Sequence, residues 1–201
     1  LAQVLAGYDK DGKVLDLDLD GNILAGGTNH RDVFIIPFSR LLVKDEIKKG
    51  SFTMQLGVGT SFANPFQNSI SITDASGSDG YFVNSPAGEY GILFANNRTG
   101  TPILTAKQAS ATNQIPVGLL YYQAGIAVLT ASVFSAEPLG MARAGANGPH
   151  AGGLLNGTTD CQMGGYTNVT QMLTASNIQG AANALRHRIQ DITFNNTTCL
   201  L

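Results

Sequence analysis

Residues 31–59 read RDVFIIPFSRLLVKDEIKKGSFTMQLGVG, and they open the stretch of the chain that decides the fold. The stretch continues with SISITDASGSDGYFV at residues 69–83, EYGILF at residues 89–94 and VGLLYYQAGIAVLTASVF at residues 117–134. Val, Ile, Tyr and Phe are favoured in strands, whereas Gly, Asn, Asp and Ser are favoured in the turns between them. The pattern therefore predicts a mainly β domain.

Alternation of apolar and polar residues predicts where the individual strands lie. The predicted strands are residues 13–20, 33–38, 51–58, 69–73, 80–83, 90–94, 117–122 and 125–134. Residues 44–50 are charged and predict a turn or a single helical turn, and residues 74–80 predict the loop of a hairpin between two strands. The strand at 125–134 is apolar on both faces, so we expect it in the middle of the sheet.

The last third of the chain has a different pattern. Residues 136–166 form a long Gly/Ala/Asn-rich segment. A loop of that length in a compact domain usually has a function. A capping box at residues 176–179 and an apolar helical face predict a helix over residues 177–190, followed by a closing strand at 191–198. The predicted fold is an antiparallel sandwich-like domain with one packed α-helix near the C-terminus. Its parts are the domain at 1–135, an interface loop at 136–166, and a helix and strand at 167–201 packed on the same domain.

Composition narrows the class of partner. Only 13% of the 201 residues are charged, about half the usual share, and the net charge is −2. This leaves no basic field to hold nucleic acid, and the longest apolar run, residues 125–134, is too short to span a bilayer. A surface poor in charge suits burial against neighbouring subunits. Two cysteines, Cys161 and Cys199, leave both a disulfide and two free thiols open.

Three carboxylates at alternate positions suggest the start of a calcium loop. Asp16, Asp18 and Asp20 have the right spacing, but Gly27 stands where the bidentate Glu of such a loop belongs. The leucines between them explain the spacing as the solvent face of a strand. We therefore expect no metal and no other cofactor.

The sequence contains no residue pattern that is typical of a catalytic site. His30, His150 and His187 are far apart, and no G-x-S-x-G turn is present to hold a nucleophile. His187 lies between two arginines on the polar side of the predicted helix. Tyr121 and Tyr122 point to opposite faces of a strand, so packing is favoured over a sugar-stacking pair. We expect no enzyme and no catalytic residue.

Two motifs resemble a known family. Lys44, Ile47, Gly50, Ser51, Phe52 and Met54 fit a K-x-x-[IV]-x-x-G-[ST]-[FW]-x-[LM] pattern, and residues 118–130 resemble a G-L-x-Y-Y-Q-A-G-I-A-V-L-T hairpin. Both are similar to virion structural proteins of contractile-tailed phages that infect marine cyanobacteria. The resemblance covers residues 33–134. It implies a tail, baseplate or neck component that carries no catalytic residues and is located in the virion after assembly in the host cytoplasm.

The expected function is to make protein–protein contacts in a multi-copy phage assembly. The expected partners are other virion proteins, as a homo-oligomer or ring, without nucleic acid or membrane. The predicted interface residues lie in the long loop and are Met141, His150, Leu154, Leu155 and Met163. The main alternative is a host-surface carbohydrate-binding adhesin of the particle, because such adhesins share the β-rich, uncharged, Gly/Asn/Thr-rich composition of this chain. A secreted glycan-active enzyme is a third possibility.

Overall fold

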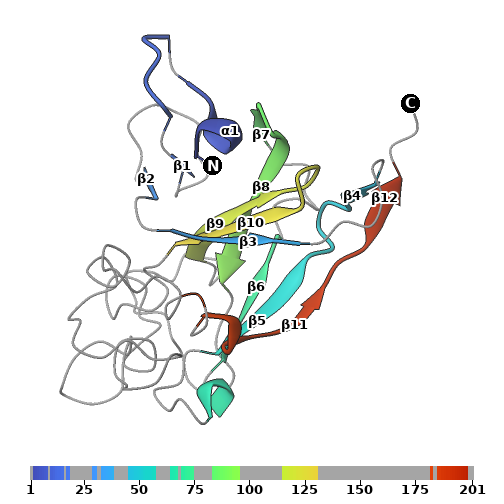
Figure 1. Ribbon diagram of the computed structural model, residues 1–201. Coiled ribbons are helices and arrows are strands. Elements are labelled where there is room, and N and C mark those ends of the chain that lie inside the picture. Colours follow the sequence, from blue (N-terminus) through green and yellow to red (C-terminus); the bar gives the residue numbers. More distant parts are fainter. Residues whose placement is uncertain are drawn as a thin grey trace, which may run out of the picture.

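The computed structural model describes residues 2–8, 10–15, 17–18, 29–30, 33–38, 45–57, 64–67, 69–74, 83–95, 115–130, 182 and 185–198. Within these residues the protein is mainly β, and its paired strands run antiparallel (Figure 1). The predicted fold class is confirmed at this level. No helix in the described part of the chain is long and apolar enough to cross a membrane.

The main sheet of the described residues follows the order β11-β5-β6-β8-β9-β10-β3. The bounds are β3 (Val33–Pro37), β5 (Thr53–Gly57), β6 (Ser69–Thr73), β8 (Gly88–Ala95), β9 (Ile115–Tyr121), β10 (Ile126–Thr130) and β11 (Ile189–Thr193). β7 (Val83–Ser85) pairs with the first residues of β8. Separate ribbons pair β1 (Leu17–Asp18) with β2 (Asn29–His30), and β4 (Asp45–Ile47) with β12 (Asn196–Thr198). The helical elements are α1 (Ala2–Ala6) and the short 3-10 helix η1 (Pro65–Gln67).

The sheet curls into a half-barrel, and its two edge strands approach each other at one end. Phe38 follows β3 and Phe194 follows β11, and the centroids of their rings lie 5.6 Å apart. Phe52, just before β5, lies 5.6 Å from Phe38 and 6.4 Å from Phe194. Aromatic side chains from both edges therefore pack together and stabilise the curl at this end.

The inner face of the curl is apolar from strand to strand. Met54 of β5 lies opposite Ile72 of β6, which lies opposite Ala95 of β8. A second row runs through Leu93 of β8 and Leu129 of β10, with a glycine of β9 between them. All these apolar side chains are buried, and each large one stabilises the fold by about 1.5–3 kcal/mol relative to exposure.

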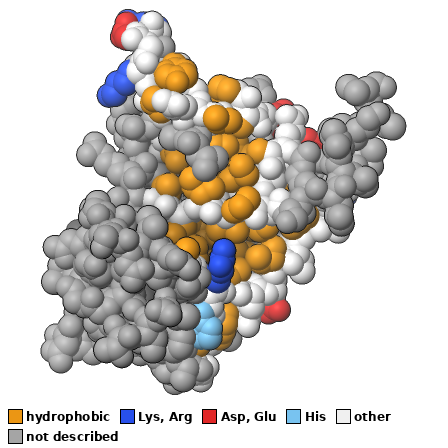
Figure 2. Space-filling view, viewed as in Figure 1, with side chains coloured by type: hydrophobic (Ala, Val, Ile, Leu, Met, Phe, Trp, Pro, Cys, Tyr) orange, Lys and Arg blue, Asp and Glu red, His pale blue; other side chains and the backbone are white. Residues whose placement is uncertain are grey.

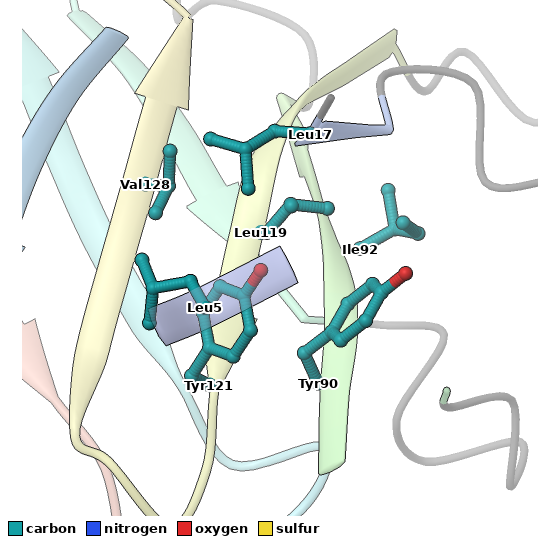
Figure 3. Close-up of a cluster of buried hydrophobic side chains, with 7 residues drawn as sticks. All are labelled: Leu5, Leu17, Tyr90, Ile92, Leu119, Tyr121 and Val128. Carbon is teal, nitrogen blue, oxygen red and sulfur yellow. The ribbon is translucent and has the colours of Figure 1, made fainter. Parts of the chain in front are cut away.

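The outer face of β8, β9 and β10 carries a second cluster, which the N-terminal segment covers. Leu5 from α1 and Leu17 from β1 pack onto this face (Figure 3). The strands contribute the buried residues Tyr90, Ile92, Leu119, Tyr121 and Val128. The Tyr90 and Tyr121 rings lie 5.1 Å apart, and burial raises the pKa of Tyr121, with a smaller effect from Tyr90.

The structure confirms the inner position predicted for the apolar strand at 125–134 over its described part, β10. β10 lies between β9 and β3, so it is not an edge strand, as its two apolar faces required. Tyr121 and Tyr122 are both buried. Tyr121 belongs to the outer cluster, and Tyr122 lies next to Gly91 and Asp74 on the other face.

Several finer predictions need correction. No sandwich is confirmed, because the described strands of the main sheet form one curled layer. The hairpin predicted around residues 74–80 is wrong, since β6 pairs with β5 and β8 while β7 pairs with β8. Part of the predicted turn at 44–50 is strand β4. Leu15 is exposed while Leu17 is buried, so these leucines do not share one buried face.

The predicted C-terminal helix is also not confirmed. Ala182, Leu185 and Arg186 have helical backbone, but Ile189 and Gln190 belong to strand β11. The helical spacing of Ile189 misled the prediction, because this residue pairs with Leu56 of β5. The closing strand predicted at 191–198 is present in two parts, β11 and β12.

Candidate functional site

The predicted interface residues Met141, His150, Leu154, Leu155 and Met163 lie outside the described residues. The whole loop at 136–166 lies outside them as well, together with Cys161 and Cys199. Their proposed roles stay predictions.

Most of the carboxylates that suggest a calcium loop also lie outside the described residues. Asp16 and Asp20 are not among them, and Asp18 is placed by its backbone in β1. Among the side chains that the structure describes, no three His, Cys, Asp or Glu residues come close enough to share a metal ion.

Strand β3 forms one edge of the sheet, and the pairing pattern shows which backbone groups face outward. Phe38 N–H donates to the Gly125 carbonyl at 2.8 Å, and Ile35 lies opposite Val128 in the register of β3 and β10. In an antiparallel pair, alternate residues bond to the partner strand. Val33, Ile35 and Pro37 therefore direct their backbone groups away from β10, and Pro37 has no N–H to offer.

This edge is apolar as well as unpaired by any described strand. Val33, Ile35 and Ile36 are half-buried, and Pro37 is exposed. Val33 and Ile35 pack partly against the outer cluster, together with Ile126 of β10. Figure 2 shows hydrophobic side chains gathered in the middle of the visible face. We call Val33, Ile35, Ile36 and Pro37 the β3 edge. An apolar edge strand of this kind is a template for pairing with another chain.

The opposite edge, β11, is built differently. The register between β11 and β5 shifts between Gln190 and Thr193, and Asp191 has a φ of 51°. Asp191 and Thr193 are exposed and polar. A bulge and a charge are devices that discourage strand pairing at an edge. The two edges thus differ in what they can bind.

A second feature is a buried polar junction at the turn of residues 48–51. Asp74, at the end of β6, accepts the N–H of Gly50 at 2.7 Å and the N–H of Phe52 at 2.9 Å. Lys48 N–H donates to the Asn195 carbonyl at 2.7 Å, and Ile47 N–H donates to the Tyr122 carbonyl at 3.1 Å. The turn and its neighbour Ile47 are therefore tied to β6, to β9 and to the link between β11 and β12.

Charged groups surround the same turn. Lys49 pairs with Glu89 of β8, and its ammonium lies 5.9 Å from the centroid of the Tyr122 ring. The pKa of Tyr122 is raised by burial first and then by the nearby carboxylate of Asp74. The pKa of Asp74 is raised by its own burial, which outweighs the hydrogen bonds from Gly50 and Phe52.

Sequence reasoning missed two members of the buried polar set. The sequence pattern places Asp74 in a hairpin loop and Arg188 on the solvated face of a helix. Arg188 is in fact buried, and its Nη1 donates to the Gly57 carbonyl at 2.9 Å. Burial lowers the pKa of Arg188 to about 10. The local sequence carries no signal for either role, because the partners are far away along the chain.

No protein-family model, curated protein or solved structure matches this chain.

Proposed function

We propose that this chain is a structural component of a tailed bacteriophage particle, of the tail, baseplate or neck. In this role it makes protein–protein contacts in a multi-copy assembly with copies of itself or with other virion proteins. The observation that carries the contact function is the β3 edge, which combines apolar side chains with outward-facing backbone groups. The placement in a phage particle rests on the resemblance of residues 33–134.

Leaving such an edge in water is unfavourable. Half-buried Val33, Ile35 and Ile36 lie on a strand without charged side chains, and a partner strand would bury them further. Main-chain hydrogen bonds would supply affinity, and the alternating side chains would supply specificity. The bulge and the charge of β11 discourage pairing at that edge, so we expect the partner strand to pair with β3.

A pair of matched substitutions tests the proposal in the phage that encodes the chain. Ile35→Lys puts a charge on the β3 edge, and Ile192→Lys puts the same charge on exposed Ile192 of β11. Mass spectrometry of purified particles should find the wild-type chain and Ile192→Lys, and it should find Ile35→Lys strongly depleted. Circular dichroism of each purified variant checks that it folds.

Two results would overturn the proposal in different ways. Purified particles without the wild-type chain would remove the virion role. Normal incorporation of folded Ile35→Lys would leave the virion role standing and would remove the β3 edge as the contact.

The alternative function as an adhesin is supported by polar side chains on the outer face of β11 and β5. Thr53 and Thr193 hydroxyls are hydrogen-bonded at 2.6 Å, and Gln190 Nε2 donates to Gln55 Oε1 at 3.0 Å. Uncharged hydrogen-bonding groups of this kind suit sugar hydroxyls. Binding of the purified chain to host-surface glycans, lost in Gln55→Ala, would favour this alternative over an assembly role.

A further inference from the structure

Asp74 is a buried carboxylate with an unusual set of partners. It is 1% exposed, and its two oxygens accept hydrogen bonds from the backbone of Gly50 and Phe52. A buried carboxylate is costly when ionised unless a cation lies against it. The ammonium group of the same turn, on Lys49, pairs with Glu89. Asp74 thus relies on neutral donors, namely the two backbone amides and the Tyr122 hydroxyl.

The groups around Asp74 and its neighbour Tyr122 come from each element packed against them. The turn contributes Lys49 and two amide groups, β8 contributes Glu89, and Tyr122 follows β9. The Tyr122 hydroxyl is buried and faces the Asp74 carboxylate, whose charged form it favours as a hydrogen-bond donor, although this contact falls short of regular hydrogen-bond geometry. A Cβ at Gly91 would lie 2.1 Å from this oxygen, so the glycine leaves the space that the hydroxyl occupies.

We propose that Asp74 is a proton-operated clamp on the turn of residues 48–51. When the carboxyl takes up a proton from solvent, its O–H donates to the Tyr122 hydroxyl oxygen, which reverses the contact that Tyr122 makes with the ionised form, and its carbonyl oxygen still accepts from the turn. The protonated form therefore carries no buried charge and keeps Tyr122 as a hydrogen-bond partner. The clamp is a property of the fold and does not depend on the proposed phage role.

The direction of the pH effect follows from the folded and unfolded states. Burial raises the folded pKa of Asp74 above its ordinary value of 3.8. Between 3.8 and the folded pKa, the folded chain holds a proton that the unfolded chain has released. This group's contribution to stability therefore increases as the pH falls through the folded pKa, and it is complete below the unfolded value. Most buried carboxylates with a cationic partner behave in the opposite way.

The clamp has a structural readout beyond stability. Gly50 and Phe52 N–H groups point at the two carboxylate oxygens, so protonation weakens at least one acceptor. Their amide resonances should shift with the same midpoint as the Asp74 carboxyl. The turn also leads directly into the β4–β12 ribbon through Lys48 and Asn195. Amide exchange in that ribbon should change over the same pH range.

The test is an NMR titration of the wild-type chain from about pH 7 to about pH 3, with melting temperatures measured alongside. We expect the Asp74 carboxyl carbon to titrate with a midpoint above 3.8, and the Gly50 and Phe52 amides to follow it. Asp74→Asn should lose this midpoint and the matching rise in melting temperature. Glu46→Gln, which removes a carboxylate from β4 outside this set, should keep both.

An Asp74 midpoint at or below 3.8 in the wild-type chain overturns the proposal. The proposal also fails if the rise in melting temperature persists unchanged in Asp74→Asn. The titration of the wild-type chain remains decisive even where Asp74→Asn does not fold.

Discussion

Gly57 and Arg188 are joined by two reciprocal hydrogen bonds. Gly57 N–H donates to the Arg188 carbonyl at 2.7 Å, and Arg188 Nη1 donates to the Gly57 carbonyl at 2.9 Å. Gly57 ends β5, and Arg188 immediately precedes β11. The pair therefore attaches the last strand of the main sheet to the strand beside it, through a buried guanidinium.

Replacing Arg188 should destabilise the fold strongly. Arg188→Ala removes the donor to a buried carbonyl and leaves a cavity, so we expect the free energy of unfolding to fall by about 3–5 kcal/mol. Urea denaturation followed by circular dichroism measures the change. Arg186→Ala, at an exposed position two residues earlier, should stay within about 0.5 kcal/mol of the wild type. Equal effects of the two variants would contradict the buried role of Arg188.

Gly91 and Tyr122 should be coupled through their close approach. Gly91→Ala places a methyl group 2.1 Å from the Tyr122 hydroxyl oxygen, and overpacking of this kind costs about 1–3 kcal/mol. Tyr122→Phe removes that oxygen, and the next ring atom lies 3.0 Å away. The double variant should therefore recover part of the lost stability in a double-mutant cycle. Strict additivity of the two substitutions would show that the positions do not meet.

The aromatic contact between the two sheet edges should contribute to the curl. Phe52 is buried between Phe38 and Phe194, so Phe52→Ala should lower the free energy of unfolding by about 3–5 kcal/mol. Ile192→Ala, a truncation at an exposed position on β11, should have an effect below about 1 kcal/mol. Thermal denaturation of both variants checks this. A Phe52→Ala variant as stable as Ile192→Ala would rule out this contact as a main support of the curl.

The sequence predicted those strands whose side chains alternate or whose apolar run is long. β5 and β6 fall within the predicted ranges because Met54 and Ile72 repeat an alternating pattern, and β9 and β10 follow a long apolar run with a short turn. These signals are local. The sequence carried no comparable signal for which strands become neighbours: the turn residues after Thr73 indicate a change of direction, but β6 pairs with β8 rather than β7.

The candidate sites were harder to predict for the same reason. Asp74 lies in a segment whose composition is typical of a loop, and its role comes from amides 22 and 24 residues earlier in the chain. The apolar character of β3 was visible in the sequence, whereas its position at an edge was not, because edge and centre depend on pairing. Periodicity in residues 178–189 fitted a helix, but pairing with β5 placed Ile189 in a strand.

A high-resolution image of the intact phage particle tests the central claim most directly. We predict repeated copies of this chain, each with the backbone of Val33 and Ile35 within hydrogen-bonding distance of a strand from a neighbouring chain. Copies whose β3 edge faces solvent, with contacts made elsewhere, would contradict the assignment of the β3 edge. A particle without this chain would contradict the virion role itself.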